Sequence, residues 1–405
     1  IKLATLSDTD ATNVTGAELV TNGTFATDTT GWTAGNGATL AVASGKLQIT
    51  SGGSGNGFAY QAITTEVGKV YVTSVDYTDD TGGSGLLWIG TSAGGNQTAL
   101  TTFNATGGYN LTFTATATTH YLRVGANEPT ASLVYLFDNI SVRLAEEDRS
   151  VNGNGLQVFG TVTKTAVATG ADLVGYNGFS ASNYLEQPYN ADLDFGTGDF
   201  SIMGWVKQSA SGTGRLLDRE GGTNDNYIII YSTSGAISVA LKDGPSVSVV
   251  APTSPFGVWQ LFNVVRTSGV LYLYVDGVSV GTPVASTHNV TNTAAPLFLG
   301  VRTNLASPFS LGSLALLRIS ATAPTAAQIA KIYEDEKHLF QENAQATLYG
   351  SSDAVTALAY DDTTDLLHAG TSAGRSVFQG LRRVDNTTTA VSAAISASNN
   401  LVGEQ

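Results

Sequence analysis

The stretch LYLYVDGVSVG, residues 271–281, contains the strongest local fold signal in the sequence. Apolar residues alternate with tyrosines up to Asp276-Gly277, and the same period resumes at Val278. Asp-Gly between two alternating runs predicts a type I′ β-hairpin, because both central residues of that turn need positive φ and these two residue types tolerate it. Asp276 is therefore interpreted as a turn residue and not as a catalytic acid.

The same alternation recurs along most of the chain, in short runs separated by Gly, Asn and Ser clusters. Period-two runs at this spacing predict an all-β protein with two β-sandwich (jelly-roll) domains in tandem. At 405 residues the chain is also too long for one ordinary core. The expected divisions are a connector over 1–17, a first jelly roll over 18–147 and a second sandwich over 148–322.

The segment that follows the second sandwich has a helical pattern. Thr325 and Gln328 form a capping box after Pro324, and apolar residues from Ile329 to Phe340 recur at helical spacing. We therefore expect one C-terminal helix over 323–345, with the acidic trio 334–336 on its solvated face. A short propeller-blade-like β segment over 346–384 and a low-complexity tail or oligomerisation segment over 385–405 complete the chain.

Composition excludes several function classes. A net charge of −14 argues against nucleic acid as a partner, since no basic patch could offset phosphate repulsion. Cysteine is absent, which removes disulfides, thiolate nucleophiles and Cys-based zinc sites and favours a bacterial or viral product. No run of 18 apolar residues occurs, so membrane insertion is not expected. The start at Ile1 without a leader predicts a fragment or a processed product.

The sequence offers no enzyme motif. The four histidines lie apart from one another and from any G-x-S-x-G elbow, and no carboxylate pair on facing strands can be read from the sequence. We therefore expect a non-enzymatic protein with no required cofactor.

Aromatic side chains are the remaining candidates for ligand binding. Trp88 alternates with Leu87 and Ile89, so it would stand on the face opposite to them, where Tyr77 or Tyr60 could join it. These three aromatic residues form either a sugar-stacking platform or a second buried layer.

Residues 18–32, ELVTNGTFATDTTGW, and 135–142, YLFDNISV, resemble the opening and closing motifs of galactose-binding-like jelly rolls of the carbohydrate-binding-module type. That resemblance implies a structural calcium ion with Asp138 as a ligand. Ala26 stands where the family usually has an acid, so Glu18 or backbone carbonyls would have to substitute.

The second domain is similar to laminin-G-like, concanavalin-A-like lectin sandwiches, on residues 190–207, 259–281, 296–301 and the helix of 324–336. Residues 355–372, VTALAYDDTTDLLHAGTS, resemble one β-propeller blade, which cannot close a propeller by itself. The whole arrangement resembles bacteriophage tail-fibre or virion appendage proteins.

These observations favour a viral fibre or virion structural protein that displays lectin-like domains and binds host-surface glycans. Its expected partners are a host-surface polysaccharide and other virion proteins, and its expected assembly is a homotrimer, because individually weak sugar sites gain from avidity. The expected location is the virion, outside the cell. The alternatives are a purely structural or decoration protein without a ligand, a bacterial cell-surface adhesin and, least favoured, a polysaccharide-degrading enzyme.

Overall fold

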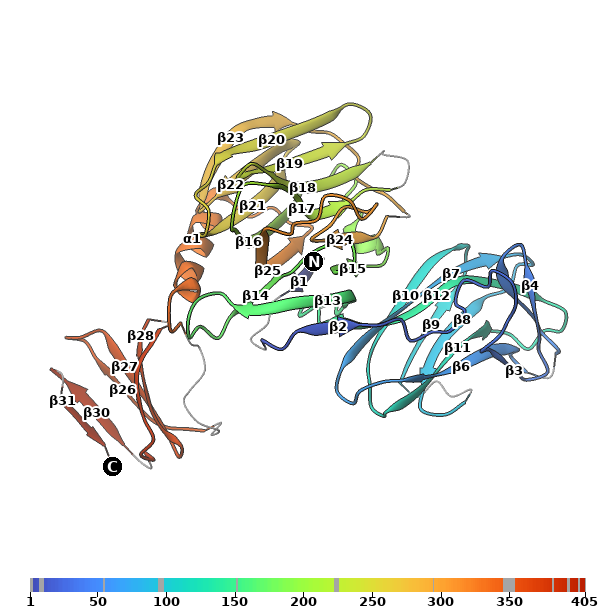
Figure 1. Cartoon of the computed structure of the whole chain (residues 1–405), viewed down its shortest axis with the longest axis horizontal. Helices are drawn as coiled ribbons and strands as arrows, with labels where there is room; N and C mark the ends of the chain where they lie inside the picture. Colours follow the sequence, from blue (N-terminus) through green and yellow to red (C-terminus); the bar gives the residue numbers. More distant parts are fainter. Residues whose placement is uncertain are drawn as a thin grey trace.

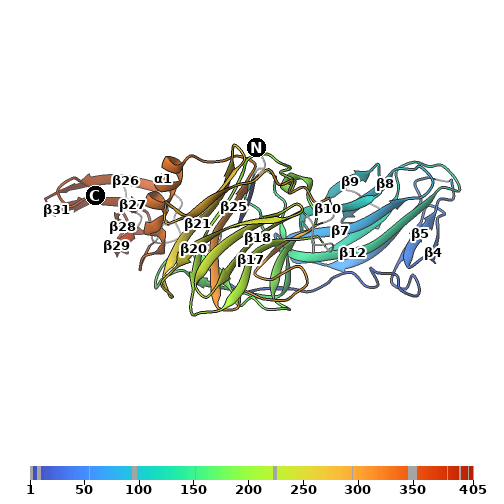
Figure 2. The ribbon, with the colours of Figure 1, turned by 90° about the horizontal axis from the view of Figure 1, so that it is seen from above.

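The computed structural model describes residues 3–6, 11–53, 55–93, 98–150, 152–221, 226–293, 295–344, 354–380, 382–391, 394–399 and 401–404. The described chain is nearly all β, with one α-helix, which confirms the predicted fold class. A first sandwich, a second sandwich and a small C-terminal group of strands follow one another along the molecule (Figures 1 and 2).

The first sandwich consists of two antiparallel sheets. The β6 sheet has the order β3-β6-β11-β8-β9, with β3 Thr33–Gly35, β6 Phe58–Thr64, β11 Thr119–Ala126, β8 Gly85–Gly90 and β9 Ala99–Phe103. The β7 sheet pairs its strands in the order β4-β5-β12-β7-β10, with β4 Thr39–Ala43, β5 Lys46–Thr50, β12 Val134–Glu146, β7 Val70–Asp79 and β10 Gly107–Thr114. Alternate residues such as Leu122 and Val75 meet between the sheets and form the core.

The second sandwich is larger. In its β16 sheet, β25 pairs with β16 on one side and with β1 and β14 on the other, and β21, β22 and β23 follow β16. The bounds are β1 Leu3–Leu6, β14 Val174–Asn177, β25 Gly312–Ser320, β16 Phe200–Gln208, β21 Trp259–Thr267, β22 Val270–Val275 and β23 Val278–Ala285. The facing β17 sheet has the order β13-β15-β24-β17-β18-β19-β20. Its bounds are β13 Leu156–Ala166, β15 Tyr184–Gln187, β24 Leu297–Leu299, β17 Thr213–Arg219, β18 Tyr227–Thr233, β19 Ala236–Lys242 and β20 Ser246–Thr253, with the short 3-10 helix η1 Ala191–Leu193 after β15.

Residues 1–17, expected to form a connector, contribute strands to the second sandwich. Strand β1 pairs with β25, and β2 Val14–Gly16 pairs with β13. The two sandwiches are also joined directly, since the end of β12 pairs with β13. Because these backbone pairings cross the boundary, the sandwiches are held by more than the connecting chain.

The predicted hairpin of residues 271–281 is confirmed. It joins β22 to β23, and both Asp276 and Gly277 have positive φ, at 50° and 82°. The Asp276 carboxylate additionally accepts a hydrogen bond of 2.9 Å from the Leu261 backbone N–H, which fixes the turn to the neighbouring strand β21. The aspartate therefore has a structural function beyond its tolerance of positive φ.

The predicted helix is also confirmed, as α1 Ala326–Glu336 followed by the 3-10 helix η2 Lys337–Phe340. Thr325 and Gln328 form the expected capping box. The helix packs on the outer face of the β16 sheet (Figure 1), where Trp205 stacks on Phe340 at 4.2 Å between ring centroids. No helix in the described part of the chain has the length and hydrophobicity needed to cross a bilayer.

The expectation for the acidic trio 334–336 needs one correction. Glu334 and Asp335 are exposed, as expected for a solvated face. The Glu336 carboxylate instead accepts a hydrogen bond of 2.8 Å from the Trp205 indole N–H. It also forms an ion pair with Arg318 at 2.6 Å. It faces the sheet because i and i+2 point to different sides of a helix.

The C-terminal part contains a four-stranded antiparallel sheet in sequence order, the arrangement of a propeller blade. Its strands are β26 Val355–Asp361, β27 Leu366–Thr371, β28 Gly374–Gln379 and β29 Arg382–Thr387. In the predicted tail, β30 Ile395–Ser398 and β31 Leu401–Glu404 pair as a hairpin. Residues 345–353, which include the expected start of the blade-like segment, lie outside the described residues.

Candidate functional site

The predicted aromatic platform is not formed. Tyr77 lies in the core of the first sandwich, where it is 1% exposed and contacts the rings of Phe103 and Phe137 at 5.5 and 5.4 Å. It belongs to the β7 sheet, whereas Trp88 and Tyr60 belong to the β6 sheet. The alternation around Trp88 could not show that the two tyrosines come from different sheets.

Trp88 and Tyr60 do share the outer face of the β6 sheet, because both stand opposite Arg123 on β11. Trp88 is nevertheless only 4% exposed, since the Arg123 guanidinium covers it at 4.0 Å and contacts Phe58 on its other side at 3.7 Å. Burial lowers the pKa of Arg123 to about 10, so the guanidinium stays charged at neutral pH. Of the two alternatives for Trp88, the structure therefore has the buried layer. The half-buried pair of Tyr60 and Tyr121, with ring centroids 6.1 Å apart, is what this face offers a ligand.

The two predicted calcium ligands have other partners in the structure. The Glu18 carboxylate accepts hydrogen bonds from the backbone N–H groups of Val20 and Val142 and from the Ser141 hydroxyl, at 3.0, 2.9 and 2.6 Å. It also forms an ion pair with Arg143 at 3.3 Å. Asp138 accepts a hydrogen bond from the backbone N–H of Asn139. A calcium ion at Glu18 would have to displace these donors.

Among the described residues, no group of three or more His, Asp or Glu side chains is arranged to hold a metal ion. The Glu18 carboxylate joins the segment before the first sandwich to β12. The groups around it are hydrogen-bond donors and a guanidinium, which do not suit a cation. Calcium at Asp138 stays a prediction.

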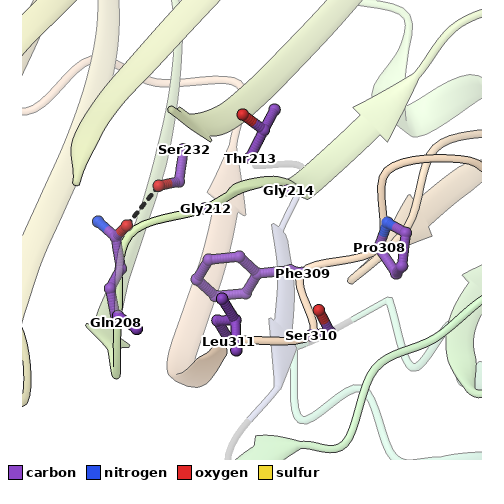
Figure 3. Close-up of a pocket in the computed structure, with 10 residues that line it drawn as sticks. Gln208, Gly212, Thr213, Gly214, Ser232, Pro308, Phe309, Ser310 and Leu311 are labelled. Carbon is purple, nitrogen blue, oxygen red and sulfur yellow. Dashed lines mark hydrogen bonds between the residues drawn. The ribbon is translucent and has the colours of Figure 1, made fainter. Parts of the chain in front are cut away.

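One pocket in the second sandwich is too small for a sugar. It lies between β16, β17 and the loop around Phe309, and the side chains of Gln208 and Ser232 hydrogen-bond beside it (Figure 3). Its volume is about 20 Å³. A space of this size holds one water molecule.

A larger groove lies where the two sandwiches meet, with a volume of about 400 Å³. This volume is within the range of small-ligand sites. The first sandwich contributes strand β7, the start of β10 and the bulge in β12. The second sandwich contributes β15, the residues directly after it and the segment before β24. The lining includes two carboxyl groups, two tyrosines, two prolines and small polar groups: Ser74, Asp76, Tyr109, Asn139, Glu186, Pro188, Tyr189, Thr293 and Pro296.

Contacts across the boundary fix the two walls of the groove. The Asn110 side chain donates a hydrogen bond of 2.8 Å to the Tyr189 carbonyl, and the Gln157 side chain donates one of 3.2 Å to the Val72 carbonyl. On the first wall, Asn139 Nδ2 donates to Asp76 Oδ2 at 2.8 Å. Tyr109 packs on Phe103 at 4.3 Å between centroids, which holds its ring at the edge of the groove.

Glu186 is the most perturbed group in the groove. Burial raises the pKa of its carboxyl to about 7, and the Arg143 guanidinium opposes this shift. Within the described part of the chain, no side chain donates a hydrogen bond to it. A half-buried carboxyl at the wall of a groove that has no side-chain donor is a candidate for ligand contact.

Sequence reasoning missed Glu186 and Asp76. Glu186 stands in YLEQPY, and Asp76 stands at a polar position of the alternating run KVYVTSVDYT. Each is the expected solvent-facing residue of a strand, so no local signal separates it from other exposed acids. The two residues line one groove because the sandwiches dock through β12 and β13.

The second sandwich matches a known family. Residues 179–330 match the family model Laminin_G_3, described as the concanavalin A-like lectin/glucanases superfamily. No curated protein matches the chain.

Solved structures of clostridial toxin binding domains are similar to the chain. The binding domain of Paraclostridial Mosquitocidal Protein 1 is 14% identical with a TM-score of 0.41, and the match covers 64% of this chain and 69% of that chain. The receptor binding domain of botulinum neurotoxin C/D mosaic serotype is 14% identical with a TM-score of 0.40, and the match covers 58% of this chain and 59% of that chain. The botulinum neurotoxin serotype G binding domain is 10% identical with a TM-score of 0.39, and the match covers 57% of this chain and 58% of that chain. This chain thus spans less than two thirds of either neurotoxin domain. The family match covers residues 179–330, so the similarity to the concanavalin A-like lectin/glucanases superfamily is limited to the second sandwich and the helix that follows it.

Proposed function

We propose that the protein is a non-enzymatic, lectin-like component of a virion fibre and that it binds a host-surface glycan in the groove between its two sandwiches. The observation that supports this proposal is the groove itself. Its tyrosines and prolines can stack on the C–H faces of a sugar, and its carboxyl groups can accept hydrogen bonds from sugar hydroxyls. The lectin-type family of the second sandwich is consistent with a binding role.

The proposal that the protein belongs to a virion rests on three properties of the chain: the absence of cysteine, the acidity and the modular β architecture. A bacterial cell-surface adhesin shares these properties and is the alternative location. A second candidate function is a purely structural virion component, which the burial of Trp88 favours, because that residue is then part of the packing and not of a ligand site.

We predict that the isolated chain binds at least one glycan on an array and that Glu186→Gln and Asp76→Asn each lower the affinity about tenfold. Each substitution keeps the side-chain shape and replaces a charged acceptor by an amide. Tyr121→Ala on the outer face of the β6 sheet is the matched control and should leave the affinity unchanged. Isothermal titration with the best array ligand measures the three affinities.

The outcomes separate the candidates. If Tyr121→Ala abolishes binding while the groove variants bind normally, the site is the Tyr60–Tyr121 pair. Absence of binding to any glycan at millimolar concentration supports the structural role. Release of reducing ends from a bound glycan contradicts the non-enzymatic proposal, because Asp76 and Glu186 in one groove are also the residue types of glycoside hydrolysis.

We also propose that the protein assembles as a homotrimer through its C-terminal strands. Large apolar side chains are exposed there on both sheet and hairpin: Val355, Leu358, Tyr360, Leu367, Val384 and Leu401. Tyr360 and Leu367 stand directly opposite each other on neighbouring strands, so the apolar surface is continuous.

We predict that light scattering gives three times the 41.8 kDa mass of the chain and that the double variant Leu358→Ser/Tyr360→Ser reduces it towards one chain. Removing two large apolar side chains from an interface weakens the apolar contact that drives association. Val67→Ser, at an exposed residue of the first sandwich, is the control and should leave the mass unchanged. A monomeric mass for the unmodified chain would refute the trimer.

A further inference from the structure

The ionisable side chains that line the groove are acidic, apart from its tyrosines. Asp76 and Glu186 line it directly, and Asp138 stands opposite Asp76 on the neighbouring strand. Burial, and secondarily the charge of Asp76, raises the pKa of Asp138. No lysine or arginine lines this groove among the described residues. The groove therefore presents acceptors and negative charge to a ligand.

The cation nearest to Glu186 is already engaged. Arg143 lines the adjoining hollow, where its guanidinium lies over the Phe159 ring at 4.2 Å and pairs with Glu18 at 3.3 Å. The ion pair and the aromatic contact hold the guanidinium in the hollow. A ligand in the groove meets the carboxyl of Glu186 and not a positive charge.

We propose that the groove selects hydroxyl-rich ligands that carry a protonated amine, such as amino sugars of a surface polysaccharide, over neutral sugars, and that it excludes anionic ones. The inference rests on the proposed function, because it names the ligand class of the same groove. An ammonium group supplies the hydrogen bond that the Glu186 carboxylate lacks, and a charge-assisted hydrogen bond of this kind is stronger than a neutral one. A uronic acid or a sulfated sugar meets like charge at Asp76 and Glu186.

The selectivity is pH-dependent. With a pKa of about 7, Glu186 is largely protonated at pH 6 and half ionised at pH 7. The groups that face it are Tyr184 on its own strand, Arg143 from β12 and, across the groove, Asp76 from β7. Burial raises the pKa of Tyr184 to about 12, so this group stays neutral between pH 5.5 and 7. Affinity for an amine-bearing ligand therefore rises with pH over this range.

The experiment measures the affinity of the full chain for three oligosaccharides of equal length by isothermal titration. The probes are oligomers of glucosamine with free amines, of N-acetylglucosamine and of galacturonic acid. At pH 7 we expect the free-amine oligomer to bind about tenfold more tightly than the acetylated one and the uronate not to bind. Because the glucosamine amine also loses its proton near neutral pH, the pH dependence is measured as the ratio of the unmodified chain's affinity to that of Glu186→Gln for the same oligomer. This ratio is expected to rise from pH 6 to pH 7 as Glu186 ionises.

Two variants provide the controls. Glu186→Gln should remove both the preference for the amine and its pH dependence, whereas Asp335→Asn on the exposed face of α1 should change neither. Equal affinities for the free-amine and acetylated oligomers, or tighter binding of the uronate, overturn the inference. If a neutral oligomer binds and Glu186→Gln weakens it without any preference for the amine, the inference fails and the proposed function stands. If no glycan binds, both fail.

Discussion

Arg266→Met is expected to lower the free energy of unfolding of the second sandwich by about 3–5 kcal/mol. Arg266 is 0% exposed, and no carboxylate in the described part of the chain forms an ion pair with its guanidinium. It donates instead to three backbone carbonyls, those of Gly198, His288 and Gly196, at 2.7, 2.6 and 2.7 Å. Methionine fills a similar volume but leaves three partly buried carbonyls without these donors, and each costs about 1 kcal/mol or more.

The arrangement explains why a charged residue stands in the apolar run of β21. The carbonyls belong to two loops, before β16 and after β23, and the guanidinium ties both to the strand. Chemical denaturation is monitored by fluorescence in a background with Trp32→Phe and Trp88→Phe, so that the signal comes from Trp205 and Trp259 of the second sandwich. Arg382→Met, at an exposed arginine, is the control. A change below 1 kcal/mol for Arg266→Met would show that the loops satisfy their carbonyls in another way.

Local signals in the sequence predict local structure well. Asp276-Gly277 adopts the positive φ values that a type I′ turn requires, and the Thr325–Gln328 capping box forms at the start of α1. In both cases a few neighbouring residues supply the main physical cause: the tolerance of Asp and Gly for positive φ, and the side-chain hydrogen bonds between Thr325 and Gln328.

The candidate site could not be predicted in the same way. Strand alternation correctly placed Trp88 on the face opposite to Leu87 and Ile89, but it contains no information about what covers that face. The cover is Arg123, a residue 35 positions away by its number in the sequence. The groove depends on contacts between residues even farther apart in the sequence, because it forms where the two sandwiches dock. Docking places Glu186 in the same groove as residues of β7 from the other domain.

Trp205→Ala is expected to destabilise the second sandwich by about 3–5 kcal/mol and to detach α1 from the β16 sheet. Trp205 is 2% exposed, stacks on Phe340 at 4.2 Å and lies against Tyr333 at 5.8 Å. Its indole N–H donates to Glu336, so the substitution opens a large cavity and also removes a hydrogen bond that joins strand to helix.

The conservative variant Trp205→Phe separates these two contributions. Phenylalanine keeps most of the stacking area and lacks the N–H donor, while Arg318 still pairs with the Glu336 carboxylate at 2.6 Å. A loss of about 1–2 kcal/mol is therefore expected for this variant. Hydrogen exchange of residues 326–336 distinguishes detachment from simple destabilisation, since Trp205→Ala should speed exchange in α1 far more than in strand β22. Equal acceleration in both elements would mean that helix and sheet unfold as one unit, and that Trp205 contributes to the sandwich as a whole and not specifically to the docking of α1.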